Sequence, residues 1–243
     1  MRLDKALSGS GEGTRSELKK IIRSGKVSVN GKVVTDPGFK VELSDDISVY
    51  GNEVAVKENL YFILDKPDGV LTAMEDKRLP TVADYIPENL KGKKLSPVGR
   101  LDYHTTGLLI ITNDGELSHR LTSPKYKIPK MYEVTYSGDP LTEQHVKQCI
   151  DGVILEEEGK KTVLKPSELE LKEDGRCILT LYEGKTHEVR RIIASFGRSV
   201  LTLRRFRIGD VVLNENEPGT LRPLTHEELV SLKEQAGLMP DPS

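Results

Sequence analysis

The sequence predicts an α+β protein built from two unlike parts, and three observations support this fold class. Residues 1–50 form a short stretch with their own helix, strand and turn signals. From Leu60 onward, short β-rich runs alternate irregularly with helices, which favours a largely antiparallel, mixed sheet flanked by helices over a doubly wound parallel sheet. The length of 243 residues corresponds to one or two domains. We therefore expect a small domain at 1–50, a linker at 51–59 and a larger domain at 60–243.

Composition narrows the class of protein. Lys and Arg number 36 against 38 Asp and Glu, so the net charge of −2 provides no uniform basic coat for nucleic acid. Apolar runs such as Leu60–Leu64 are too short to cross a bilayer, and the N-terminus lacks the apolar stretch of a signal peptide. Cys149 and Cys177 offer neither a disulfide framework nor metal-ligand spacing. We expect a cytoplasmic, monomeric protein that does not contact membranes.

The first part predicts a helix followed by a hairpin. Thr14 and Glu17 fit a capping box, apolar residues follow at helical spacing, and Gly25 stands where such a helix ends. Asn30-Gly31 lies between β-branched residues, which is a strong hairpin signal. A compact helix and hairpin are therefore expected within residues 1–50.

Basic side chains gather in this first part. The segment from Arg15 to Lys32 holds six basic residues and one acid, Glu17. Such a cluster fits either a solvated helix face or a surface that contacts phosphates. The six residues are Arg15, Lys19, Lys20, Arg23, Lys26 and Lys32.

The larger part is expected to contain at least five strands and five helices, from its apolar periodicity. The turn residues Asn113-Asp114-Gly115 indicate a hairpin. The last helix has a capping box at Thr225 and Glu228 and ends at Gly237. Strands are expected at 61–64, 108–112, 132–136, 178–182 and 200–203, and helices near 82–86, 116–121, 142–150, 188–196 and 227–235.

Asp102 is the first candidate for chemistry. It lies in a Gly- and Thr-rich loop just before the apolar strand at 108–112. Catalytic side chains are commonly found on loops that a rigid sheet holds in place. The alternatives are that Asp102 caps a turn or pairs with Arg100.

Tyr132 is the second candidate. It shares one strand face with Val134 and Tyr136 by period-two alternation, a pattern that an ordinary half-buried aromatic residue also shows.

A third segment runs from Glu183 through a Gly turn into a helix. Between Lys185 and Arg207 it holds seven basic residues and one acid, Glu188. A helix N-terminus with this cluster suits phosphates. The alternative, a solvated basic face, is weakened because the apolar residues of the same helix require packing.

Several motifs, in order along the chain, resemble those of the pseudouridine synthases. The resemblance is to the ribosomal family that joins an S4 RNA-binding module to its catalytic domain. Two positions depart from the family pattern, because Asp65 stands where Asn is common and Glu188 replaces the usual Gln. The matching segments are residues 2–5, 14–16 and 25–31 for the S4 module and 64–70, 99–109 and 183–191 for the catalytic domain.

This resemblance implies an αL-type S4 domain and a synthase that converts one uridine of ribosomal RNA to pseudouridine, in 16S rRNA at a site of the uridine 516 type. It gives Asp102 the catalytic role, Arg190 the role of its ion-pair partner and Tyr132 contact with the base. Burial favours a protonated aspartate, and a nearby guanidinium keeps it ionised. The RNA contacts that we expect are Arg2, Lys5, Arg15, Lys19, Lys20, Arg23, Lys26, Lys32, Arg100, Lys185, His187 and Arg191.

The reaction involves no redox change, so no cofactor is expected. The sequence shows no Gly-rich dinucleotide loop, and its five histidines have no metal-ligand spacing. Two other interpretations stay open. One is a 23S rRNA synthase of the same family, and the other is a non-catalytic S4 assembly factor, against which the intact loop at 99–102 argues.

Overall fold

The chain folds into two compact units that divide near Leu60. The computed structural model describes residues 2–8, 13–42, 44–54, 59–157, 160–214 and 217–238. Most of the expected linker, residues 55–58, and the end of the expected larger domain, residues 239–243, lie outside the described residues. Each unit is considered by itself below, as the N-terminal unit and the larger unit.

The N-terminal unit contains two helices and a four-stranded antiparallel sheet in the order β2-β1-β3-β4. The predicted capping box of Thr14 and Glu17 is present in both halves, and the chain turns after the helix at Gly25, with φ of 71°. Asn30 and Gly31, at φ of 50° and 76°, form the predicted tight turn. The elements are α1 (Leu3–Ser8), α2 (Arg15–Arg23), β1 (Val27–Val29), β2 (Lys32–Val33), β3 (Ile47–Val49) and β4 (Asn52–Glu53).

The larger unit is built on one mixed sheet, which confirms the predicted α+β class. Nine of the described strands form it in the order β11-β12-β8-β13-β7-β5-β15, with β14 beside β13 and β6 beside β7. Neighbouring strands run antiparallel except β13 and β7, which run parallel. The strands are β5 (Tyr61–Lys66), β6 (Ser96–Pro97), β7 (Thr106–Thr112), β8 (Lys130–Ser137), β11 (Glu168–Leu171), β12 (Arg176–Leu181), β13 (Ser199–Ile208), β14 (Val211–Val212) and β15 (Leu221–Pro223).

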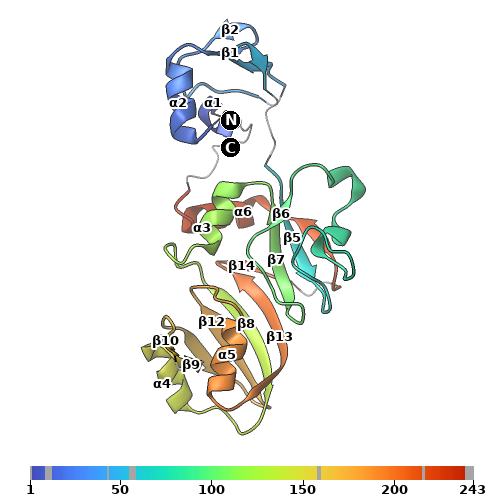
Figure 1. Ribbon diagram of the computed structural model, residues 1–243, viewed down its shortest axis with the longest axis vertical. Helices are drawn as coiled ribbons and strands as arrows, with labels where there is room; N and C mark the ends of the chain where they lie inside the picture. Colours follow the sequence, from blue (N-terminus) through green and yellow to red (C-terminus); the bar gives the residue numbers. More distant parts are fainter. Residues whose placement is uncertain are drawn as a thin grey trace. The chain divides into compact units, whose positions relative to one another are not determined.

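Helices cover the sheet in two groups (Figure 1). One group, α4 and α5, contributes to the core that includes β8, β12 and β13, and the other group, α3 and α6, shares a second core with β7 and β14. A separate hairpin, β9 (Ile154–Glu157) and β10 (Lys160–Val163), lies beside the first group. The helices are α3 (Gly115–Thr122), α4 (Glu143–Asp151), α5 (Glu188–Ser195) and α6 (His226–Gln235).

The central strand β7 supplies both cores. Successive side chains of a strand point to opposite faces, so Leu109 and Ile111 join the core under α5 whereas Leu108 and Ile110 join the core under α3 and α6. This burial on both faces explains why the sequence shows a continuous apolar run here rather than an alternating one.

The predicted hairpin at Asn113-Asp114-Gly115 is wrong. These residues join β7 to a helix, because the Asp114 carboxylate accepts hydrogen bonds from the backbone N–H groups of Glu116 and Leu117 and so caps α3. A further difference lies at 82–86, where the structure forms a short 3₁₀ helix (Val82–Tyr85), followed by another at Glu88–Leu90.

Candidate active site

The loop that carries Asp102 is tied to the sheet by a buried lysine. Lys66, at the end of β5, is fully buried, and its Nζ donates hydrogen bonds to the carbonyl oxygens of Tyr103 at 3.3 Å and Thr105 at 2.9 Å. Burial lowers the pKa of Lys66 to about 8, while the negative charges of Asp68 and Asp102 act in the opposite direction. The lysine thus fixes the backbone on the C-terminal side of Asp102.

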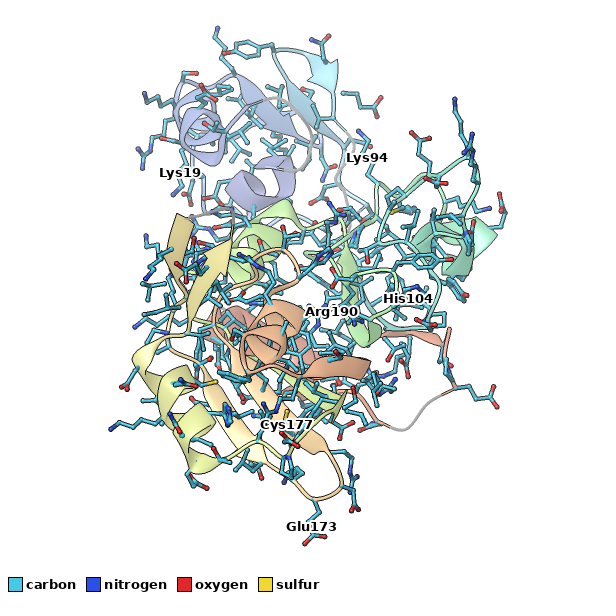
Figure 2. The ribbon with its side chains drawn as sticks, turned by 60° about the horizontal axis from the view of Figure 1, so that its bottom comes forward. Lys19, Lys94, His104, Glu173, Cys177 and Arg190 are labelled. Atoms are coloured by element: carbon cyan, nitrogen blue, oxygen red, sulfur yellow. The ribbon has the colours of Figure 1, made fainter. Side chains whose placement is uncertain are left out.

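Two side chains, one from α5 and one from the residue directly before it, approach the Asp102 carboxylate. Arg190 Nε lies 3.9 Å from Oδ2, and His187 Nε2 lies 3.5 Å from Oδ1. Arg190 also donates from Nη2 to the carbonyl oxygen of His104 at 2.8 Å (Figure 2). The side chains of Asp102 and Arg190 are 32% and 30% exposed, so both remain within reach of a ligand. The guanidinium therefore links α5 to the carboxylate and to its loop.

His187 adopts an unusual backbone conformation directly before α5. Its φ of 52° is in the left-handed region, which histidine tolerates better than most residues with a Cβ. Its side chain makes no capping hydrogen bond to the helix, and the imidazole lies against Asp102 instead. Backbone strain of this kind is common at functional sites.

Asp102 and Tyr132 line one cavity of about 130 Å³. Tyr132 belongs to β8, where it is paired with Leu179 of β12 and Arg205 of β13, and it is only 8% exposed. The residues around the cavity come from the loop before β7, from the end of α3, from β8, β13 and the end of β12, and from the start of α5 with the loop before it. They include Arg100, Leu101, Thr105, Lys130, Leu181, Lys185, His187, Glu188, Val189, Leu203, Arg205 and Ile208.

Three of these cavity-lining residues are charged side chains that are almost fully buried. Lys130, Glu188 and Arg205 are 8%, 4% and 3% exposed. Burial raises the pKa of the Glu188 carboxyl to about 7, and the nearby Glu183 adds to this effect, although a hydrogen bond from the Lys185 N–H opposes it. Burial, followed by the positive charge of Arg205, lowers the pKa of Lys130 to about 8.

Comparison with known proteins identifies this arrangement. Residues 60–195 match the RNA pseudouridylate synthase family, and residues 1–47 match the S4 domain. The chain is 40% identical to ribosomal small subunit pseudouridine synthase A of Haemophilus influenzae over 235 residues, which cover 96% of this chain and 99% of that protein. The chain belongs to the RNA pseudouridine synthase family.

Other pseudouridine synthases are similar to nearly the same degree. Ribosomal large subunit pseudouridine synthase B of Bacillus subtilis is 39% identical over 236 residues, 96% of this chain and 95% of that protein. A crystal structure of a pseudouridylate synthase has a TM-score of 0.68 and 39% identity, with 96% and 99% of the two chains covered. This likeness confirms the S4 and synthase folds that the motifs implied, and it makes the protein an isomerase.

The structure brings several predicted site residues of the synthase together. Asp102 and Tyr132 line one cavity, and Arg190 lies 3.9 Å from the Asp102 carboxylate, although the three residues come from separate segments of the larger unit. Arg100, Lys185 and His187 also line this cavity. Arg191, which directly follows Arg190 in α5, is half-buried and is not among the residues that line the cavity. Among the described ion pairs, those of Asp102 join it to α5 and none joins it to Arg100.

The predicted RNA contacts of the N-terminal unit lie apart from this cavity along the chain, and most of them are exposed. Lys19 is half-buried, and its Nζ lies 3.8 Å from the fully buried carboxylate of Asp4, which also pairs with Arg2 at 3.1 Å. Lys5 is half-buried, and the side chain of Arg15 is outside the described part of the molecule. The exposed residues are Arg2, Lys20, Arg23, Lys26 and Lys32.

One departure from the family pattern has a clear structural partner. Asp65, which stands where Asn is common, is fully buried and accepts hydrogen bonds from both terminal nitrogens of Arg204, at 3.0 and 2.8 Å. This bidentate pair links β5 to β13 across β7, and it provides the buried carboxylate with two charge-assisted hydrogen bonds.

The sequence analysis assigned no role to Lys130 and Arg205, although the sequence contains a feature that points to each of them. Lys130 lies two residues before Tyr132, so strand alternation places it on the same buried face. Arg205 belongs to the basic cluster between Lys185 and Arg207. No group of three potential metal ligands occurs within the described ranges, and no helix in them is long and apolar enough to cross a bilayer.

Proposed function

We propose that this pseudouridine synthase converts a uridine of ribosomal RNA to pseudouridine and that Asp102 is its catalytic carboxylate. The observation that carries this proposal is the position of Asp102 on a cavity that Tyr132 also lines, with two basic side chains within 4 Å of its carboxylate. A carboxylate that is kept ionised can act on a sugar carbon, as it does in enzymes that cleave glycosidic bonds.

Each neighbour of Asp102 has a distinct part in the proposed reaction. Arg190 stabilises the negative charge of the carboxylate and, through the His104 carbonyl, holds the loop against α5. Tyr132 offers an aromatic surface to a uracil ring that has left its stack. Asp102 then either bonds to the sugar or removes a proton from it, the N-glycosidic bond breaks, and the base rejoins through carbon.

The N-terminal unit is proposed to position the RNA. The exposed basic residues of α2 and of the β1–β2 hairpin suit phosphate contacts, which give affinity and orientation without reading sequence. We assign this task to an S4 domain at residues 1–50, joined by a linker at 51–59 to a catalytic domain at 60–243, in a monomeric cytoplasmic enzyme. Removing a uridine from its stack costs a few kcal/mol, which the phosphate contacts offset.

We propose the small ribosomal subunit as the source of the substrate, with 16S rRNA modified at a uridine of the 516 type. The support is the similarity to the Haemophilus influenzae enzyme, and the similar identity to the Bacillus subtilis large-subunit enzyme supports 23S rRNA as a second candidate. Mapping pseudouridines in both ribosomal RNAs from cells that lack the protein separates the two, since one position should revert to uridine. A loss confined to 23S rRNA would overturn the 16S assignment.

The substitution Asp102→Asn tests the catalytic proposal. It keeps the size of the side chain and removes its charge, so we expect pseudouridine formation to vanish while RNA affinity stays within about twofold. The matched control is Asp139→Asn, which alters an exposed aspartate in the turn after β8 and should leave the rate unchanged. Unchanged isomerisation by Asp102→Asn would refute the role of the carboxylate, and absence of activity in the wild type would favour a non-catalytic assembly factor.

A further inference from the structure

Two buried cationic side chains line the cavity, and neither has an ion-pair partner within the described part of the chain. Lys130 Nζ donates a hydrogen bond to the carbonyl oxygen of Ile128 at 3.1 Å, and Arg205 Nε donates to that of Leu108 at 2.9 Å. None of the described ion pairs includes either side chain. Glu188, the buried acid of the same cavity, accepts a hydrogen bond from the Lys185 N–H at 2.8 Å. The charges of the two cations are therefore only partly compensated.

Hydrogen-bond donors of the cavity wall also lack partners. Arg205 Nη2 and Thr105 Oγ1 are both buried and have no hydrogen-bond partner within the described residues. A buried polar group without a partner destabilises the folded state, and a buried charge destabilises it more strongly. Here these groups line the cavity that holds Asp102. Buried hydrogen-bond donors that the protein holds in place stabilise negative charge that develops during a reaction.

We propose that Lys130 and Arg205 stabilise the uracil ring as an anion after it has left the ribose, an inference that rests on the proposed function. When the N1–C1′ bond breaks, its electron pair moves to the base, so the free ring carries a negative charge shared by N1, O2 and O4. This holds whether Asp102 bonds to the sugar or removes a proton from it. The ring then turns and C5 bonds to C1′, as Asp102 either leaves the sugar carbon with its electron pair or returns the proton that it removed from the sugar. C5 then loses its proton and N1 gains one. Substrate and product are isomers, and no electron is gained or lost.

The wall of the cavity favours a flat base over an RNA phosphate as the anion. Tyr132 provides an aromatic surface, and Leu181, Val189 and Leu203 provide apolar ones, which suit a planar ring. The two cations supply charge at the edge of such a ring. They would also keep the detached base in the cavity while it turns, because a charged base binds more tightly here than a neutral one.

The test compares two free bases as probes of the full-length protein at pH 7. The nitro group of 5-nitrouracil makes it largely anionic at this pH, whereas uracil is neutral. By calorimetry, we expect wild type to bind 5-nitrouracil at least about tenfold more tightly than uracil. Lys130→Met should reduce this preference by about tenfold and leave the affinity for uracil nearly unchanged. Replacing a buried charge by an apolar side chain of similar size is generally tolerated by the fold.

Two further variants sharpen the comparison. Lys233→Met is the matched control, because Lys233 is a buried lysine of α6, over the Tyr61 ring and outside the cavity lining, and its removal should leave the preference unchanged. Arg205→Lys keeps a positive charge and can keep the bond to the Leu108 carbonyl, but it loses the second nitrogen. We expect a several-fold lower preference for the anionic probe, and a wild-type preference would exclude Arg205 from the role.

Turnover provides an independent readout. Removal of one donor to a developing anion typically lowers kcat about 10²-fold, so Lys130→Met should slow pseudouridine formation by this order with unchanged RNA affinity. An equal preference in Lys130→Met and wild type would overturn the inference, as would displacement of 5-nitrouracil by equimolar inorganic phosphate. If wild type forms pseudouridine but shows no anion preference, this inference alone fails. If wild type forms none, the proposed function fails.

Discussion

Replacing Glu188 with Gln should remove a pH dependence from the stability of the larger unit. Burial raises the pKa of the Glu188 carboxyl to about 7, against an ordinary value of 4.5 that applies to the unfolded chain. Between these two values the folded state binds more protons than the unfolded state, so stability falls as the pH rises. The contribution of Glu188 is fully present below pH 4.5 and is lost as the pH passes through about 7.

The size of the effect follows from the same two pKa values. One unit of pKa difference corresponds to about 1.36 kcal/mol, so the shift from 4.5 to about 7 corresponds to about 3 kcal/mol at pH 8. Glutamine keeps an oxygen that can accept the hydrogen bond from the Lys185 N–H, and it carries no charge at any pH. Relative to wild type, Glu188→Gln should therefore gain about 2 to 3 kcal/mol in stability between pH 5 and pH 8, slightly less than the full shift because an unfolded carboxyl is already largely ionised at pH 5.

Urea unfolding at pH 5, 6, 7 and 8, followed by far-ultraviolet circular dichroism, measures this gain directly. The control is Glu173→Gln, which changes an exposed glutamate in the turn between β11 and β12 (Figure 2). Its stability relative to wild type should not vary with pH. The reasoning is refuted if the difference between wild type and Glu188→Gln is the same at pH 5 and at pH 8, because a buried carboxyl that ionises normally would give that result.

Three further variants test other parts of the molecule. Arg190→Ala should lower kcat by about 10²-fold with an unchanged dichroism spectrum, because Asp102 loses its guanidinium neighbour; a near-normal rate would exclude the ion pair. Lys20→Ala combined with Arg23→Ala should weaken RNA binding and lower the slope of log affinity against log salt by about 1 to 2, and an unchanged slope would place the RNA elsewhere. Gly107→Ala should destabilise the protein by at least about 3 kcal/mol in urea unfolding, because φ is 101° and the new Cβ would meet a carbonyl oxygen of β13 at 2.2 Å; wild-type stability would contradict this close approach.

Local signals were sufficient to predict elements whose caps and turns lie within a few residues. The capping boxes at Thr14 and Thr225 and the turn at Asn30-Gly31 are stabilised by neighbours in sequence, so their patterns predict them directly. Asn113-Asp114-Gly115 carries the same turn chemistry and still begins a helix. What decides between the two outcomes is the packing of the next residues against α6, which no local pattern contains.

In the candidate site, too, some features follow from local sequence and others depend on how distant segments pack. Asp102, Arg190 and Tyr132 could be proposed from short motifs, and the structure places Asp102 and Tyr132 on one cavity with Arg190 beside the Asp102 carboxylate. The burial of Lys130 and Arg205 could not be derived in this way, because it depends on β8 and β13 lying side by side in the sheet. A basic residue is usually solvated, and the strand pairing shows that these two are buried.

The position of β13 in the sheet has a consequence for protein synthesis. This strand lies between β8, which carries Tyr132, and β7, which follows the Asp102 loop, and it pairs with both. A nascent chain that ends before Ser199 lacks the strand that joins these halves, however well each half has begun to fold. More than four fifths of the polypeptide must therefore have been synthesised before the cavity that Asp102 and Tyr132 line can form. Products that terminate before Ser199 lack the strand that joins β7 to β8.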